Sequence, residues 1–437
     1  MRSPVGRPAI TRDAFMALWL GQTVSALGTQ VSMVALPLIA VLTLNVGPFE
    51  LGVLAALETV PYLILSLPAG AIVDRVDHRR TMIACDIGRA VALLATTAAM
   101  ALGVLSIGLL CVVGLVVGSL SVFFTVAYTS YLASILPPDR LVAGNQRLEL
   151  SESGARVAGP SIGGALMQLA GGAAAATLDG LSYLVSALAI FGSGRPARTA
   201  PVAQDQVGFL ESMGAGLRHV LGDRILRDLA GSTAIFNLGS GMILAVVVLF
   251  ATREIGLDAA EFGLVYGLGN VGFVLGALLV GVLTRRFGVG RTFAWSSFAS
   301  AGVVSFARGL NDTPKMAALL LVAGRFVGAA ATPIYNVDSL SLRQARVSHA
   351  IMGRVNGTFQ FLEWGALPIG SLVGGVLGSA LGPRAALAAA AACGVVSAIW
   401  IATSPARRLT TLEGPKALGE ATSTDQVDPG LRPPLVA

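Results

Sequence analysis

The chain contains 437 residues, of which 54% are hydrophobic and only 12% are charged, and its mean hydropathy is +0.75. So few charged residues cannot cover the surface of a water-soluble protein of this length, so the composition excludes that class and indicates a membrane protein. A net charge of +6 can indicate nucleic-acid binding. Here the basic residues lie in short segments between apolar runs, which argues against a nucleic-acid partner.

Twelve runs of about 20 or more mostly apolar residues are long enough for a helix to cross roughly 30 Å of hydrocarbon. They lie near residues 14–43, 50–73, 82–102, 107–135, 146–169, 172–193, 226–251, 260–284, 291–310, 317–341, 354–379 and 384–403. The first run is far longer than the apolar core of a cleavable signal peptide, so we expect it to remain as the first span. The runs predict an all-α integral membrane protein with twelve transmembrane helices.

The polar segments divide these runs into two bundles. Residues 1–13 are expected to form a cytoplasmic tail, and 14–193 a first bundle of six helices. The connection 194–225 carries apolar residues at three- and four-residue spacing, which favours an amphipathic helix on the cytoplasmic membrane surface. A second six-helix bundle is expected over 226–403. The tail 404–437, rich in proline and polar residues, is expected to be cytoplasmic and disordered.

The distribution of Lys and Arg predicts the orientation. Of the 30 such residues, 23 fall on the side of the amino terminus and 4 on the other side, and basic residues are retained on the cytoplasmic side of short loops. We therefore expect a multi-pass protein of the cell (inner) membrane with both termini in the cytoplasm, surrounded by the lipid bilayer.

An internal repeat relates the two bundles at a constant offset of 211 residues. Gly70 and Arg75 return as Gly281 and Arg286. The same shift relates six more positions: Glu50 and Glu261, Asn145 and Asn356, Glu152 and Glu363, Gly154 and Gly365, Gly163 and Gly374, and Gly164 and Gly375. A register without gaps indicates two copies of one unit, a design typical of secondary transporters.

Two motifs resemble those of a known family. One follows the second apolar run and consists of Gly70, Asp74, Arg75, Arg79 and Arg80. The other lies in the fifth run and consists of Gly154, Gly159, Pro160, Gly163 and Gly164. The first resembles the signature loop of the major facilitator superfamily, and the second resembles the antiporter motif of its proton-coupled drug exporters. Short motifs at Gly21-Gln22, Asp139 to Asn145 and Gly353 to Gly357 are similar to the group containing the enterobactin exporter and macrolide and actinobacterial efflux pumps.

The resemblance implies that the first motif forms a cytoplasmic gate, closed when the carrier faces outward. Physically, Gly70 permits close helix approach, Asp74 can face the positive end of a neighbouring helix, and the arginines can anchor to phosphates. A purely topological role is an alternative that explains the arginines but explains Asp74 poorly. In the second copy Arg285 stands where the first has Asp74, so the carboxylate half of the lock is missing there.

The antiporter motif is expected to bend and to pack against the other bundle. Pro160 removes a backbone hydrogen bond, and the glycines around it allow close approach. The alternative is that these glycines serve only helix packing.

Two carboxyl groups within the apolar runs, Glu58 and Glu363, are candidates for proton coupling because ionisable groups in hydrocarbon are costly. A structural, hydrogen-bonded carboxyl is the alternative for each, and for Asp179 a structural role is the expectation. The exporters' fourth-helix arginine has no counterpart, since residues 107–135 contain no Arg; Arg325 in the tenth run is the nearest analogue. Sodium coupling or a different proton route is therefore an open alternative.

In this superfamily the first, fourth, seventh and tenth helices line the cavity, which makes their polar side chains candidate substrate contacts. These are Gln22, Ser25, Thr29, Thr125, Tyr128, Asn237, Ser240, Tyr335 and Asn336. A hydrogen bond between helices is the alternative for each. Polar but almost uncharged walls suit a bulky amphipathic or weakly basic solute.

Other chemistry finds little support. The three cysteines lie in separate runs without a metal-ligand spacing, Gly267 to Gly272 matches a dinucleotide motif only inside an apolar run, and no P-loop sequence occurs. We expect no enzyme, no cofactor and no metal, but a monomeric transporter that exports small hydrophobic or amphipathic molecules by proton antiport. Alternatives are a dedicated exporter of one metabolite, such as a siderophore or a self-made antibiotic, an importer, and a membrane sensor without transport.

Overall fold

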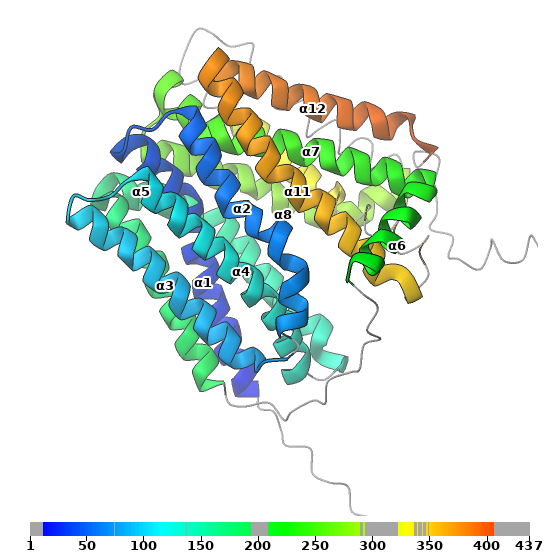
Figure 1. The fold of residues 1–437 in the computed structure, drawn as a ribbon. Coiled ribbons are helices and arrows are strands. Elements are labelled where there is room, and N and C mark those ends of the chain that lie inside the picture. The colour runs from blue at the N-terminus through cyan, green and yellow to red at the C-terminus, as the bar shows by residue number, and fades with distance from the viewer. Residues whose placement is uncertain are drawn as a thin grey trace, which may run out of the picture.

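The computed structural model describes residues 12–73, 75–136, 138–193, 209–288, 292, 322–335, 339, 343, 347 and 349–405. The amino-terminal half consists of α1 (Arg12–Leu38), α2 (Pro48–Val73), α3 (His78–Ala101), α4 (Ile107–Ile135) and α5 (Pro138–Gly192). The carboxyl-terminal half consists of α7 (Arg224–Leu249), α8 (Ala259–Phe287), a helical segment over 322–335, α11 (His349–Leu381) and α12 (Pro383–Thr403). Figure 1 shows the two halves side by side.

The prediction of an all-α membrane fold is confirmed. Nine helices in the described part of the chain are long and apolar enough to cross a membrane. One of them, α5, contains both the fifth and the sixth apolar runs, which meet at Gly171, a residue with φ 79° and ψ 171°. The ninth run, 291–310, lies outside the described residues apart from Thr292, as does the start of the tenth.

Between the halves, α6 (Phe209–Gly222) occupies part of the expected connection 194–225 and packs against α7 and α11. The predicted tails, 1–13 and 404–437, lie almost entirely outside the described residues.

Helix starts follow from local side-chain chemistry. Asp77 precedes α3 and accepts a hydrogen bond from the backbone N–H of Arg80 at 3.0 Å. Asp258 and Glu261 form a reciprocal capping box at the start of α8. Such caps satisfy backbone donors that have no partner inside the helix, so they fix where these helices begin.

The backbone repeats at the offset of 211 residues found in the sequence. A π-helical turn, η1 (Ile39–Thr43), ends the first span, and its counterpart η2 (Phe250–Glu254) follows α7. After these turns Asn45 and Gly256 have positive φ, at 53° and 81°. Gly171 and Gly382 likewise match, at 79° and 86°. At these positions of the described chain, the two halves therefore share the same backbone conformation.

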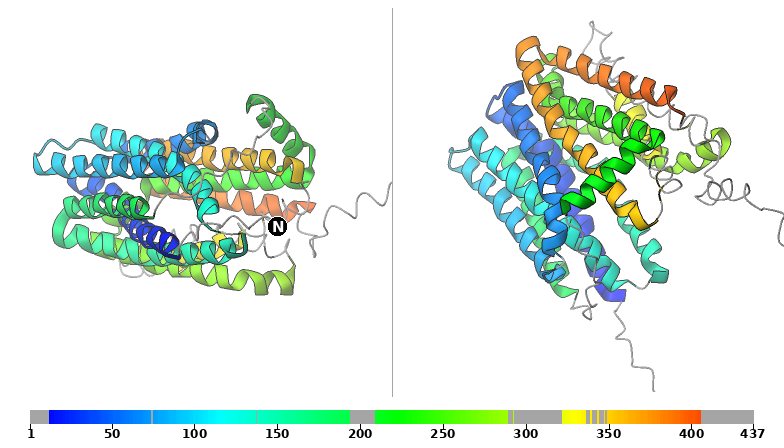
Figure 2. Two further views of the ribbon diagram at one scale, coloured as in Figure 1. Left: turned by 90° about the horizontal axis from the view of Figure 1, so that it is seen from below. Right: turned by 45° about the vertical axis from the view of Figure 1, so that its right-hand side comes forward.

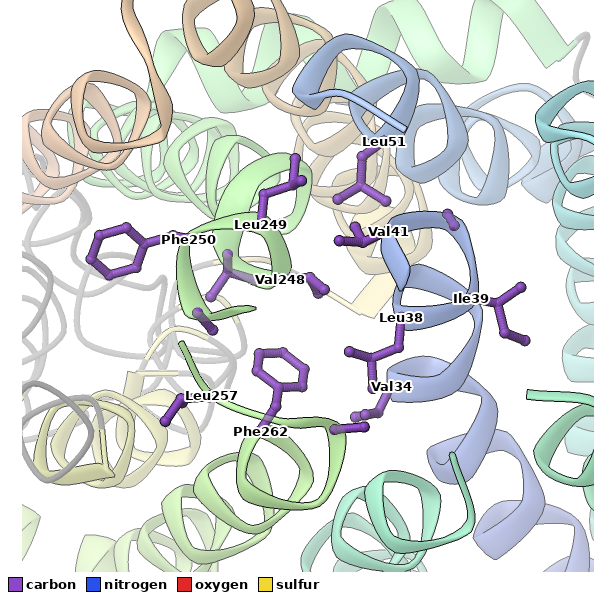
Figure 3. Packing of buried hydrophobic residues seen from close by; sticks show 14 of the residues in the cluster. Val34, Leu38, Ile39, Val41, Leu51, Val248, Leu249, Phe250, Leu257 and Phe262 are labelled. Carbon is purple, nitrogen blue, oxygen red and sulfur yellow. The ribbon is translucent and has the colours of Figure 1, made fainter. Parts of the chain in front are cut away.

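We call the membrane side at which α1 begins and α12 ends the terminal side, and the opposite one the distal side. On the distal side the halves share one apolar cluster. Figure 3 shows Val34, Leu38 and Val41 from the amino-terminal half facing Val248 and Phe262 from the other half, and all five are at most 7% exposed. Burial of this cluster holds the halves together at that side.

On the terminal side the described residues form two separate cores. One gathers Phe15, Met82 and Tyr131 within the amino-terminal half, and the other gathers Leu226 and Phe359 within the carboxyl-terminal half. The right-hand view of Figure 2 shows α2 and α11 close together at one end and diverging toward the other. The fold therefore joins its halves firmly on the distal side.

Candidate functional site

The largest contacts between the halves are those of α2 with α11 and of α5 with α8, and α2 also meets α7. The first crossing depends on Gly52, where a Cβ atom would lie 2.6 Å from the backbone oxygen of Ser371 and 2.9 Å from Cα of Gly375. The second depends on Gly164, where a Cβ atom would lie 2.3 Å from the backbone oxygen of Ala259.

The two crossings are images of each other in the repeat. At the second, the Cβ position of Gly164 also lies 2.9 Å from Cα of Gly263. Shifting Gly52 by 211 residues gives Gly263, and shifting Gly164 gives Gly375. Because backbone meets backbone at both places, neither crossing has room for a side chain.

The residues of the predicted cytoplasmic gate make no described contact across the halves. At Gly70 no heavy atom of another described element lies within 4 Å of the place where a side chain would begin. Arg75 and Arg80 are exposed. Arg79 instead binds within its own half: its Nε donates to the backbone oxygen of Ile190 at 3.0 Å, and its guanidinium lies over the ring of Phe191. Asp74 lies outside the described residues.

The predicted antiporter motif faces two directions. Gly159 and Gly163 lie against Gln30 and Val31 of α1, at 2.3 Å and 2.8 Å from their nearest atoms when a Cβ is added, whereas Gly164 lies against α8. The remaining glycine of the motif, Gly154, has no described neighbour within 4 Å. Pro160 lies within helical backbone, and the non-helical residue of α5 is Gly171 instead. The motif thus packs α5 against α1 of its own half and against α8 of the other half.

Side chains from the two halves also meet at these helix crossings. The rings of Tyr62 and Trp364 stack at a centroid distance of 4.5 Å. On the other crossing, Asn270 Nδ2 donates to the backbone oxygen of Arg156 at 2.7 Å. Arg325 in turn donates to Asn270 Oδ1 at 3.2 Å and lies 3.8 Å from the centre of the Tyr266 ring. Arg156 also forms an ion pair with Glu152 one turn away.

The two candidate coupling carboxyls lie in different bundles. Glu58 faces α4, where its Cγ lies 2.9 Å from the Cβ position of Gly114. Glu363 interacts electrostatically with Arg343 in its own half. α2 and α11 do meet, but Glu58 is on the side of α2 that faces α4.

At the Glu58 position the two halves of the repeat differ: where one half has a charged residue, the other has glycine. Glu58 corresponds to Gly269, and Gly114 corresponds to Arg325, since both pairs differ by 211 residues. In the carboxyl-terminal half the Cβ position of Gly269 lies 2.5 Å from Cβ of Arg325. Each helix crossing therefore combines one glycine with one ionisable side chain, an acid in the first half and a base in the second.

Several predicted substrate contacts bind within one bundle. Gln22 Nε2 donates to Ser186 Oγ at 2.8 Å, and the Thr29 and Tyr183 hydroxyls lie 3.0 Å apart. Tyr335 hydrogen-bonds with Thr233. The Thr125 and Ser240 hydroxyls donate to the backbone oxygens of Ser121 and Phe236 on their own helices, and the Tyr128 ring stacks on Phe124. Ser25 is buried and Asn237 is half-buried. Asn336 lies outside the described residues. The alternative of interhelical bonding thus describes Gln22, Thr29 and Tyr335.

Sequence reasoning missed a buried ion pair on α3. Asp86 and Arg89 are 0% and 5% exposed and form a charged hydrogen bond one helical turn apart. An acid followed by a base three residues later, inside an apolar run, was a readable signal, because charges at that depth need a partner.

Comparisons with known proteins agree on one family. A family model described as a transmembrane secretion effector of the major facilitator superfamily matches residues 7–419. Among curated relatives, the multidrug efflux pump Tap of Mycolicibacterium fortuitum is 26% identical over 389 residues, covering 86% of this chain and 91% of the relative. The pump of the same name from Mycobacterium tuberculosis is 28% identical over 393 residues, covering 86% and 90%.

Solved structures share the fold. A bacterial homologue of the iron transporter ferroportin in an inward-facing state has a TM-score of 0.73 at 15% identity, covering 89% of this chain and 98% of that one. A mutant of the nucleoside transporter NupG also has a TM-score of 0.73 at 15% identity, covering 89% and 99%.

Proposed function

The chain belongs to the transmembrane secretion effectors of the major facilitator superfamily and is a multi-pass membrane transporter, and we propose that it exports small hydrophobic or amphipathic molecules in exchange for protons. The observation that carries this proposal is the unequal contact between the halves. On the distal side the halves share a buried apolar cluster and two glycine crossings. On the terminal side each half has a core of its own. A carrier that alternates between two openings needs such a contact that closes one side at a time.

The terminal side is the cytoplasmic one in this proposal. The excess of Lys and Arg on that side supports it, since basic loops are retained in the cytoplasm. The conformation described here then faces the cytoplasm, ready to take up a solute for export.

Cysteine labelling tests this orientation. In a chain whose Cys85, Cys111 and Cys393 are replaced by alanine, Leu102→Cys on the distal side should react with a membrane-impermeant thiol reagent in intact cells. Arg218→Cys on α6 should react only after the cells are opened. Labelling of Arg218→Cys in intact cells would reverse the assignment.

The cavity helices and the relatives support the proposed substrate class. The side chains predicted to line the cavity are polar but uncharged, which suits amphipathic solutes better than phosphorylated ones. The Tap relatives are named multidrug efflux pumps, which supports export of several unrelated compounds.

Proton coupling is proposed at Glu58, a carboxyl held in the middle of α2 against the glycines of α4. We expect cells without their own pumps to accumulate less ethidium, and less of several unrelated antibiotics, when they carry this protein. Glu58→Gln, or a proton uncoupler, should abolish that difference because the amide cannot exchange a proton. Glu50→Gln on the same helix is the matched control, because Glu50 is exposed and only caps the helix start.

No difference in accumulation for any compound would contradict broad efflux. Lower accumulation of one compound class only would instead favour the dedicated exporter of a single metabolite.

A further inference from the structure

A buried cluster of charges lies inside the amino-terminal half, apart from Glu58 and from the gate motifs. Its centre is the ion pair of Asp86 and Arg89 on α3. The Arg89 guanidinium lies between two aromatic rings, 4.3 Å from the centre of Phe124 on α4 and 4.2 Å from that of Tyr183 on α5. Two ring faces and a carboxylate hold this cation in place.

A second carboxyl shares the same arginine. Asp179 lies in the part of α5 that follows Gly171, is 1% exposed and interacts electrostatically with Arg89. The Ser182 hydroxyl lies 3.2 Å from its Oδ1. Gly28 of α1 covers it: a Cβ atom there would lie 2.6 Å from Asp179 Oδ1, so α1 closes over the carboxyl without a side chain.

The remaining groups facing the cluster do not balance its charge. Cys85 on α3, Tyr183 on α5 and Tyr62 on α2 can lose a proton but cannot supply a positive charge, and α1 and α4 contribute only hydroxyl groups such as those of Thr29, Ser32 and Ser121. Among the described residues, the cluster therefore contains two carboxyls and one cation.

Buried charges of one sign without a partner are strongly unfavourable, so two carboxyls that share one guanidinium are stable when they hold one proton between them. The Asp86 carboxyl has a place for it: Asp86 Oδ2 is buried and has no well-aligned hydrogen-bond partner among the described residues, and the Ser186 hydroxyl of α5, which interacts with this carboxyl, carries no charge. We propose that Asp86, Arg89 and Asp179 form a site for one exchangeable proton and that this proton takes part in coupling. The coupling role rests on the proposed proton antiport.

The cluster is connected to the contact between the halves. Arg89 Nη1 donates to Ser121 Oγ at 3.4 Å, and Tyr62 interacts with both of these side chains. The ring of Tyr62 stacks on Trp364 of the opposite half. A change in protonation at Asp86 alters the net charge of the Asp86–Arg89 pair beside Tyr62, which provides a physical route from the proton to the interface.

The direct test is infrared spectroscopy of the purified protein carrying isotope-labelled aspartate, recorded across a pH titration. The wild type should show a carbonyl band of a protonated aspartic acid that disappears as the pH rises. Asp86→Asn and Asp179→Asn should each lose the band, because either change leaves one carboxylate with one guanidinium. Asp228→Asn is the matched control: Asp228 is also buried but accepts hydrogen bonds from Trp400 and Ser404, and the band should persist.

The same variants in proteoliposomes test coupling with ethidium as the probe. Each single variant should keep ethidium exchange between two ethidium-loaded compartments and lose uptake driven by a pH gradient. A band absent from the wild type, or retained in either variant, would overturn the shared proton. Gradient-driven uptake that survives the loss of the band would overturn its coupling role.

Failure of the proposed function looks different. In that case the wild type exchanges ethidium but shows no uptake driven by the pH gradient. The coupling role of the cluster is then also contradicted. The infrared experiment still tests whether Asp86 and Asp179 share a proton. If Asp86→Asn does not fold, Asp179→Asn decides the question, since it leaves the ion pair intact.

Discussion

A Gly52→Leu variant is expected to reach the membrane in a folded form and to lose export completely. The added side chain would meet the backbone of α11, with Cβ only 2.6 Å from the Ser371 oxygen and 2.9 Å from Cα of Gly375. Backbone atoms cannot move aside as the end of a flexible side chain can, so the distal side cannot close. Ethidium accumulation in pump-deficient cells measures the loss of export. Cells with the variant should accumulate as much ethidium as cells without the protein.

Two further variants make the test specific. Gly164→Leu at the symmetric crossing should have the same effect, because a Cβ atom there would lie 2.3 Å from the Ala259 oxygen. Gly108→Leu on α4 should export normally, since the nearest described atom, Ser106 Oγ, is 3.9 Å away. Normal export by Gly52→Leu would show that the crossing is not needed for transport.

Arg89→Leu should be the most destabilising single substitution in the amino-terminal half. It leaves Asp86 and Asp179 buried without their cation, and removing one partner of a buried ion pair costs about 3–5 kcal/mol. Reversible unfolding in mixed detergent micelles measures the free energy of unfolding. Arg253→Leu is the control: the exposed Arg253 guanidinium donates hydrogen bonds to Asn45 Oδ1 and to the Val46 backbone oxygen, and its loss should cost far less.

A double variant separates charge from packing. Arg89→Leu combined with Asp86→Leu removes both charges, and apolar residues often replace a buried ion pair with little loss, so the double variant should be more stable than Arg89→Leu alone. A double variant less stable than the single one would mean that Arg89 acts through its contacts with Phe124 and Tyr183, not through its charge.

Much of the fold was predictable because the information is local. Apolar runs predict spans one at a time, and the offset of 211 residues predicts two equal halves. The structure carries that offset into details that no run contains, such as the π-helical turns at Ile39–Thr43 and Phe250–Glu254. Gly164 was predicted to allow close approach and lies at a backbone crossing, and its counterpart in the repeat, Gly375, lies at the other crossing.

The site was less predictable because it depends on how each helix is rotated. Two neighbouring turns of α2 face different partners: Glu58 faces α4, whereas Tyr62 faces α11. Position along the chain gives the depth of Glu58 in the membrane but not its direction. In the same way, Gln22 and Thr29 share one face of α1, and only the packed bundle shows that this face meets Ser186 and Tyr183 of α5.

The most direct measurement is simultaneous recording of ethidium and proton movement in proteoliposomes, with a pH-sensitive dye trapped inside. Antiport predicts that ethidium moving out of the lumen is accompanied by protons moving in, that an imposed pH gradient drives ethidium against its concentration gradient, and that a protonophore stops this uphill transport. Ethidium flux without any proton flux, or both moving in the same direction, would contradict proton antiport.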